Sequence, residues 1–515
     1  MGDRLWLLVP EFILLAGAMA CALGGISRFA SIRRRVGFIA SLFLALALIA
    51  IPYFNSQQGQ TPEGTMLPNL SFYIKMVVAF VGLLFVATAG GLVDRTYEKA
   101  IGSGKDRFDP LRSSSGEFHA LLLLSLTGVM LLCEARDLIW LFLALELVSL
   151  PTYVMVAVSR WARTAQEAAM KYFFLGALSA ALMLYGFALL YASTGSLVLQ
   201  DIAASLATQQ ADGGISAIAQ VGMLMAIFGL LYKIAAAPMH LYAPDVYQGA
   251  ASPVTAFLAF VPKTAGMIAI MTLLTLVGWD DGLPPAIEMS LWVVAVLTMI
   301  LGNIGALLQR SAKRMLGYSS IAHSGYMLIG VIAGPELGFQ AVLVYLLIYG
   351  VTNTSAFATL AALSRNGKQV DSLDDLAGLY KTSPLAAAAM AISCGSLLGI
   401  PPLFGFWGKL LLFAAGIAAG QLSLIIVAAV SSAVSAWYYL RIIGLVLLSP
   451  PQNQGDATKV SLRWPLAVAL VGACIALVGP VFLERTVTSA NEAIEIPEAE
   501  VVMPLPSVEV DGERA

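Results

Sequence analysis

The sequence predicts an all-α protein that crosses a membrane many times, and three observations support this prediction. Hydrophobic residues make up 59% of the 515 residues and charged residues only 12%, about half of the roughly 25% that is usual in soluble proteins. Apolar runs of about 20 residues, the length of a membrane-spanning helix, recur along the whole chain. Lys and Arg are concentrated in every second loop between these runs, as the positive-inside rule requires.

The composition also excludes several function classes. The net charge is −2 and no basic patch suggests a nucleic-acid partner. The four cysteines are scattered through apolar runs without a CxxC pair, so we predict no metal site and no disulfide framework. No soluble segment is large enough to hold a cofactor, and no phosphate-binding glycine loop joins a strand to a helix. We therefore expect this chain to bind no cofactor itself.

The apolar runs predict about fourteen transmembrane spans, each uncertain at its ends by a few residues. The first run lacks a basic n-region, so we interpret it as a transmembrane helix and not as a cleaved signal peptide. The predicted limits are 5–24, 36–54, 71–93, 117–133, 137–158, 170–192, 219–240, 253–276, 288–309, 316–334, 337–363, 385–415, 421–447 and 462–482.

Charge in the loops predicts the orientation of these spans. Loops that follow spans 1, 3, 5, 9, 11 and 13 carry Lys and Arg, whereas four of the alternate loops carry none: 55–70, 193–218, 278–287 and 416–420. The basic loops are therefore expected in the cytoplasm. Both termini then lie on the outer side, which requires an even number of spans.

One stretch, 226–266, predicts an interruption in a membrane helix. Its first apolar helix carries Lys233 near the middle, followed by Pro238 and His240. A lysine at mid-depth in a bilayer costs roughly 2.5–3.5 kcal/mol, and proline removes a backbone hydrogen bond. Both are tolerated only where protein or water covers them. The second helix carries Lys263 near its middle.

A second interruption is predicted at 398–412, where tandem Pro401 and Pro402 precede Lys409. Proline pairs cannot lie inside a continuous helix. Two broken spans in comparable positions of two halves indicate a repeated transporter core. Because each repeat has five spans, an odd number, the two repeats must be inverted relative to each other.

The predicted organisation therefore has five parts. Three N-terminal transmembrane helices precede the first repeat, and one last span follows the second repeat. The tail is acidic and contains proline, and we expect it to be poorly ordered. The boundaries are 1–93 for the N-terminal helices, 117–276 for spans 4–8, 288–447 for spans 9–13, 462–482 for the last span and 483–515 for the tail.

Ionisable residues inside the spans are candidates for a row of one acid and several bases across the bilayer centre. Burial favours the neutral form of each group and an opposite charge favours the charged form. Moving Lys171 or Lys233 relative to Glu146 would therefore switch proton affinity, as a pump requires. The candidates are Glu146, Lys171, Lys233, Lys263, His323 and Lys409.

Plainer interpretations stand beside this hypothesis. Lysines near helix ends can extend their amines to the membrane surface, which we expect of Lys75 and Arg441. Lys171 lies near a predicted cytoplasmic end, and both interpretations stay open for it. Glu146 could be a structural ion-pair partner only.

Plainer interpretations also exist for the histidines and for the remaining acidic residues. His323 and His240 are candidates for the proton path, although a lone histidine on an apolar helix is more often a core residue. Glu11 and Asp245 lie near span ends or in a loop, and we do not expect them to transfer protons.

Four segments carry a resemblance to a known family. They are ELVSLPTYVMVA, MKYFFLGALSAALMLYG, YKIAAAPMHLYAPDVYQGAASPVTAFLAFVPK and GIPPLFGFWGK. Together they closely resemble the antiporter-like subunits of respiratory complex I, best the N type. The resemblance covers spans 4 to 13 well and the outer spans weakly. The charged loop 94–116 and the acidic tail depart from the family pattern.

The resemblance assigns roles to individual residues. It implies that Glu146 is the acidic residue of span 5 and Lys171 a further lysine at the start of span 6. Lys233 corresponds to the lysine of the broken span 7. Lys263 corresponds to the connecting lysine of span 8, and Lys409 to the exit lysine of span 12.

The resemblance also implies a function. It implies a proton-translocating membrane-arm subunit of NADH:quinone oxidoreductase in a bacterial inner membrane, in contact with lipid. K-, M-, L-, J- and A-type subunits and a hydrophilic redox arm would be its partners, and NADH, FMN, iron–sulfur clusters and quinone would bind elsewhere in the complex. A subunit of an Mrp-type cation/proton antiporter is the alternative. A purely structural scaffold is disfavoured by the retained acid and lysines.

Overall fold

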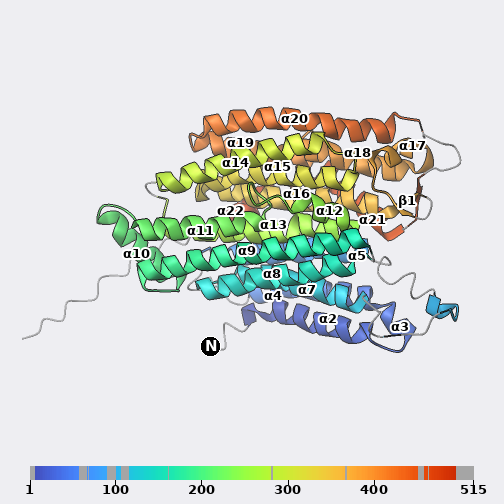
Figure 1. The fold of residues 1–515 in the computed structure, drawn as a ribbon, viewed down its shortest axis with the longest axis horizontal. Helices are drawn as coiled ribbons and strands as arrows, with labels where there is room; N and C mark the ends of the chain where they lie inside the picture. Colours follow the sequence, from blue (N-terminus) through green and yellow to red (C-terminus); the bar gives the residue numbers. More distant parts are fainter. Residues whose placement is uncertain are drawn as a thin grey trace, which may run out of the picture.

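The structure, a computed structural model, describes most of the chain. The described residues are 6–56, 66–67, 69–89, 100–105, 109, 115–160, 162–279, 282–365, 368–450, 458–461 and 463–494. Long helices lie side by side along one common direction (Figure 1). The N-terminal helices form one edge of this bundle, and α20 (Leu422–Leu447) lies at the opposite edge (Figure 1).

The first half of the chain runs from the N-terminal helices to the first predicted repeat. Its helices are α2 (Val9–Gly25), α3 (Ala30–Arg33), α4 (Val36–Ser56), α5 (Leu70–Ala89), α7 (Ser115–Leu132), α8 (Leu138–Val158), α9 (Arg163–Thr194), α10 (Leu199–Ala211), α11 (Ala217–Lys233), α12 (Ala243–Gly249), α13 (Ser252–Leu274) and the 3₁₀ turn η2 (Thr275–Val277).

The second half of the chain also consists of long helices, with short helical segments in the connections. Its helices are α14 (Pro285–Leu307), α15 (Ala312–Ala333), η3 (Pro335–Phe339), α16 (Gln340–Ala362), η4 (Leu373–Leu376), α17 (Leu379–Thr382), α18 (Pro384–Leu398), α19 (Phe404–Ala418), α20, α21 (Arg463–Val478), η5 (Gly479–Phe482) and α22 (Leu483–Ile494).

Helix length and burial confirm an all-α protein that crosses a membrane several times. Ten helical segments of the described chain are long and apolar enough to span a bilayer, and four further apolar helices are shorter. The apolar window of the α13 segment is entirely buried, whereas peripheral helices expose Ile49, Val430 and Trp437. Such apolar surface suits lipid rather than water.

Two features of the connections between spans add to the sequence-based expectation. The loop 193–218 contains α10, whose Leu199, Ile202 and Leu206 are buried, because their helical spacing forms an apolar stripe that the polar composition of the loop hides. A small sheet joins β1 (Leu363–Arg365) with β2 (Lys368–Gln369) and β3 (Lys459–Val460), both antiparallel.

The predicted unstructured tail is wrong over its first twelve residues, which form α22. Ala490, Ala493 and Ile494 are buried, again at helical spacing. The Gln340 side chain of α16 donates to the backbone oxygen of Val487 at 2.9 Å. Residues 495–515 lie outside the described residues.

Close packing of α9 against α11 depends on glycine and leads to a first prediction. A Cβ added at Gly186 would lie 2.4 Å from the Ala226 nitrogen, so Gly186→Ala is expected to destabilise the protein by about 1–3 kcal/mol. Gly444→Ala is the matched control, because a Cβ there meets nothing within 4 Å. Thermal unfolding of the purified assembly measures both. Equal unfolding midpoints would contradict this account of the α9–α11 contact.

Candidate functional site

The predicted interruption at 226–266 is present, and it lies directly at Lys233. α11 ends at this residue and α12 begins at Ala243. Lys233 is therefore the last residue of a helix and not a mid-helix residue, which corrects the sequence-based placement. Ala235 adopts a φ of 54°, a left-handed conformation that ends a helix. Pro238 and Pro244 follow, and neither can donate a backbone hydrogen bond.

The lysine at this break is paired with the acid of α8. The Lys233 ammonium lies 2.9 Å from a Glu146 carboxylate oxygen and donates to the Ser149 hydroxyl at 2.6 Å. The side chains of Lys233 and Glu146 are 2% and 16% exposed. A buried charge needs such partners, because an isolated one is far less stable.

Tyrosines surround this ion pair, although the sequence analysis did not single them out. Tyr232 precedes Lys233, and its hydroxyl donates to the Tyr172 backbone oxygen at 2.5 Å. Tyr242 donates to the Tyr232 backbone oxygen at 2.8 Å and stacks on Tyr172 with ring centroids 5.1 Å apart. Tyr153, one turn beyond Ser149, packs edge-on against Tyr172. The break is thus held by aromatic stacking and backbone hydrogen bonds.

Lys263 lies in the middle of α13, which continues through Pro262. Its ammonium donates to the Ser320 hydroxyl at 2.8 Å and to the Ser320 backbone oxygen. It also lies 4.7 Å from the centre of the Tyr349 ring, a favourable cation–π position. The Tyr349 hydroxyl donates to the same Ser320 hydroxyl at 2.7 Å, so lysine and tyrosine share one partner.

His323 follows Ser320 by one turn of α15 and lies between two tyrosines. Its Nδ1 is 2.6 Å from the Tyr345 hydroxyl and its Nε2 is 3.0 Å from the Tyr439 hydroxyl. The Tyr439 hydroxyl is also hydrogen-bonded to Ser319. Tyr345 and Tyr349 are four residues apart on α16, a spacing that is visible in the sequence. Only the structure shows that their hydroxyl groups contact His323 and Ser320 of α15.

The second predicted interruption is also present, between α18 and α19, and Lys409 faces it. Gly399, with a φ of 89°, ends α18. The Lys409 ammonium donates to the backbone oxygen of Leu398 at 2.8 Å and to the Ser432 hydroxyl at 3.0 Å. It lies 5.0 Å from the centre of the Tyr326 ring. A carbonyl released by the helix break is therefore a ligand of the lysine.

α15 connects these three lysine sites. Ser324 of α15 donates to the Ile234 backbone oxygen at the first break. Ser320 binds Lys263, and Tyr326 lies under Lys409. Because these contacts fall within seven residues of one helix, α15 places polar groups between one break and the other.

Lys171 is not part of this row. Its side chain is 44% exposed and forms ion pairs with Glu167 at 2.7 Å and Asp245 at 2.8 Å, which favours the interpretation of Lys171 as a surface lysine. Arg314 also pairs with Asp245, at 2.6 Å. Partial burial raises the pKa of Asp245, but hydrogen bonds and charges from Lys171 and Arg314 outweigh it and hold that pKa below its usual value. Lys171, Glu167 and Asp245 border a cleft of about 270 Å³.

The two histidine candidates, His323 and His240, lie in different parts of the structure. His323 lies within the row, whereas His240 occupies the turn between α11 and α12. His240 is buried, its Nδ1 has no hydrogen-bond partner, and no described hydrogen bond joins it to the row lysines.

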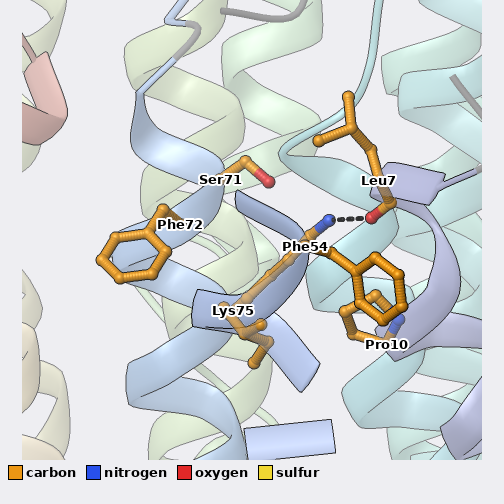
Figure 2. Close-up of a pocket in the computed structure, with 7 residues that line it drawn as sticks. Leu7, Pro10, Phe54, Ser71, Phe72 and Lys75 are labelled. Carbon is orange, nitrogen blue, oxygen red and sulfur yellow. Dashed lines mark hydrogen bonds between the residues drawn. The ribbon is translucent and has the colours of Figure 1, made fainter. Parts of the chain in front are cut away.

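The expected surface position of Lys75 is wrong, while Arg441 is exposed as expected. Lys75 is 3% exposed and forms ion pairs with Glu11 and Glu134, both at 2.8 Å. This cluster was not predictable from the sequence, because its three members belong to separate segments. Figure 2 shows the Lys75 amine beside the Leu7 carbonyl, 2.9 Å apart.

Comparison with known proteins identifies the family. Residues 135–435 match the family described as NADH:quinone oxidoreductase/Mrp antiporter, transmembrane region. NADH-quinone oxidoreductase subunit N of Trichlorobacter lovleyi is 35% identical over 95% of this chain and 96% of its own length. The chain belongs to the subunit N family of NADH-quinone oxidoreductase. Subunit N 1 of Rhizobium meliloti is 37% identical over 89% of this chain and 92% of its own.

Solved structures share the fold of this chain. A chain of respiratory complex I from Thermus thermophilus superimposes with a TM-score of 0.75 at 33% identity, over 93% of this chain and 99% of that one. A chain of the Mrp complex from Dietzia superimposes equally well, with a TM-score of 0.75, but at 22% identity over 94% and 97%. It therefore shows the shared fold alone. The family predicted from the motifs is confirmed, and the Mrp-type alternative is less supported.

Proposed function

We propose that this chain carries protons across the membrane as the N-type subunit of an NADH:quinone oxidoreductase, through the row Glu146, Lys233, Lys263, His323 and Lys409. The observation that carries the proposal is the set of polar contacts from α8 to α20, in which each of the three lysines and His323 has a hydroxyl neighbour and Glu146 is paired with Lys233. Hydroxyl groups both donate and accept, so each can pass a proton to the next group or to a bridging water.

The first step uses the ion pair at the first break. While Glu146 is ionised, it stabilises the protonated form of Lys233 2.9 Å away. Separation of the two side chains, or protonation of Glu146, removes that stabilisation in a buried site. Lys233 then releases its proton toward Lys263, and the switch is electrostatic.

The middle steps use hydroxyl groups of α15 and α16, and the last step uses the second helix break and a hydroxyl group of α20. Lys263 and Tyr349 share Ser320 as a hydrogen-bond partner, and His323 can take a proton on either ring nitrogen. Lys409 ends the row, at the carbonyl released by the second break. We assign Lys171 to the edge of the path, in the 270 Å³ cleft with Asp245, and no step to His240.

We further propose fourteen spans with two inverted repeats, 117–276 and 288–447, between three N-terminal helices in 1–93 and a last span at 462–482. Ten segments of the described chain are long and apolar enough to span a bilayer. Adding α2, α11 and α15, and counting α18 with α19 as one broken span, gives fourteen. The charge pattern of the loops supports termini on the outer side of a bacterial inner membrane.

Partners follow from the subunit N family. We propose that the chain packs against K-, M-, L-, J- and A-type membrane subunits and that lipid covers its remaining apolar surface. NADH, FMN, iron–sulfur clusters and quinone would bind elsewhere in the complex. Among the described residues, no group of three His, Cys, Asp or Glu side chains could hold a metal ion.

Lys263→Met tests the proposal in the middle of the row. Methionine fills a similar volume without a charge, so assembly is expected to persist while proton translocation falls by roughly 10²-fold, the usual effect of losing an acid–base group. NADH-driven proton translocation by the reconstituted complex measures this effect. Lys381→Met is the matched control, because Lys381 is exposed on a connecting helix. Native pumping by assembled Lys263→Met would remove this lysine from the path.

A further inference from the structure

The N-terminal helices hold a second buried charge cluster, outside the row. Lys75 of α5 meets Glu11 of α2 and Glu134 in the turn after α7, with both ion pairs at 2.8 Å. The three side chains are 4%, 1% and 5% exposed. Two carboxyl groups and one ammonium carry a net charge of −1 when all are ionised. An uncompensated charge at such depth is strongly unfavourable.

The contacts of the two carboxyl groups are unequal. One oxygen of Glu134 accepts from both the Lys75 ammonium at 2.8 Å and the Ser71 hydroxyl at 2.5 Å. Glu11 lies near the same ammonium, yet among the described residues neither of its oxygens has a hydrogen bond of good geometry, and its buried Oε2 has no partner there. Donors stabilise a carboxylate, so Glu134 is the better-stabilised anion of the two.

We propose that Glu11, Lys75 and Glu134 form a separate proton-binding site, in which Glu11 holds one exchangeable proton beside the Lys75–Glu134 ion pair. A proton on Glu11 makes the cluster neutral and accounts for this carboxyl group having fewer donors than Glu134, which binds both Lys75 and Ser71. The ligand is the proton itself, and the site needs no residue of the row.

The surroundings leave few other groups to balance the charge. From α4, the residues beside the cluster are Ile51 and Phe54, which do not titrate. The turn that carries Glu134 also contributes the Cys133 thiol, which is hydrogen-bonded to the Val129 backbone oxygen. On α5 the hydroxyl of Tyr73 points to Leu343 of α16. Among the described residues, a proton on one carboxyl is the simplest neutralising partner.

A small cavity gives this site a place for water. It has a volume of about 20 Å³ and is lined by Lys75, Ser71, Leu7, Pro10, Ile51, Phe54 and Phe72 (Figure 2), which is room for one water molecule. The cluster lies near the start of α2 and α5 and the end of α4. These helix ends lie on the side of the N-terminus, the outer side in the proposed orientation, so exchange with the outer aqueous phase is expected.

Infrared difference spectroscopy of the intact purified complex tests the proton directly. A protonated carboxyl group has its own carbonyl stretching band, which shifts in D₂O when the proton exchanges. We expect Glu11→Gln to remove one such band, equal in area to one carboxyl group, at neutral pH. Glu117→Gln is the matched control on α7, since its side chain is exposed, and it should leave this spectral region unchanged.

Two further variants change the charge of the cluster in opposite directions, so the band is expected to change in opposite directions. In Glu134→Gln the remaining carboxyl group must pair with Lys75, so the band is expected to disappear although Glu11 is still present. In Lys75→Met both carboxyl groups should become protonated, and the band should double. An unchanged spectrum in both Glu11→Gln and Glu134→Gln would overturn the proposal, and a band that never shifts in D₂O would overturn the exchange. Because the readout is spectroscopic, it stands or falls independently of pumping by the row.

Discussion

Replacement of Lys233 by Met is expected to lower proton translocation by roughly 10²-fold and to weaken the first helix break at the same time. The variant leaves the Glu146 carboxylate without its partner at 2.9 Å. Breaking a buried ion pair from one side costs about 3–5 kcal/mol, although Glu146 is 16% exposed and some of that cost is relieved by water or by protonation. Proton translocation and thermal stability of the reconstituted complex measure the two effects.

The double variant Glu146→Gln with Lys233→Met separates stability from function. It removes both charges, so stability should recover, while pumping should stay low because no titratable pair is left. Lys459→Met is the matched control, since Lys459 is exposed on β3, and it should behave as the unmodified protein. If the double variant translocates protons at the native rate, the pair is structural and the first step of the path is wrong.

The features predicted from the sequence are those with local causes. Both helix breaks were predictable, because Pro238 and the pair Pro401–Pro402 interrupt apolar runs that otherwise read as continuous helices. Lys263 was predictable as a buried amine, because apolar residues flank it for many positions on both sides. The end of α11 at Lys233 was missed, because the break begins five residues before the proline that announces it.

The features that the sequence did not reveal depend on residues far apart in the chain. Lys75 has a partner, Glu134, 59 residues away, and nothing local distinguishes it from a lysine that extends to the membrane surface. The two interpretations of Lys171 stayed open for the same reason, because its partner Asp245 is 74 residues away. Charge in an apolar run indicates that a partner exists and does not identify it.

The hydroxyl groups of the row illustrate the same limit. Ser320 and Tyr349 lie on different helices, and each is an unremarkable residue in its own run. Only the packing of α15 against α13 and α16 brings both to the amine of Lys263. The charged members of the row were therefore predictable, whereas the neutral groups that connect them required the structure.

Lys409 provides the most demanding test of the row, because it ends the row at a helix break. Its ammonium is held by the Leu398 carbonyl at 2.8 Å and the Ser432 hydroxyl at 3.0 Å, with no carboxylate bonded to it among the described residues. An exit group must release its proton and not merely hold it. Moving that charge across 100 mV costs about 2.3 kcal/mol. Lys409→Met removes the proton carrier at similar volume. We expect the complex to assemble, with both proton translocation and NADH oxidation lowered by roughly 10-fold or more.

Lys409→Arg keeps the charge and separates carrying a charge from releasing a proton. Guanidinium does not deprotonate under these conditions, so this variant is also expected to impair translocation, even though it can still donate to the Leu398 carbonyl. Lys381→Met and Lys381→Arg, at an exposed position, control for the chemistry of the substitutions. The measurement is proton translocation beside NADH oxidation in reconstituted complex. If the Met and Arg variants at Lys409 both pump at the native rate and ratio, this lysine is a structural charge, and protons leave the row elsewhere.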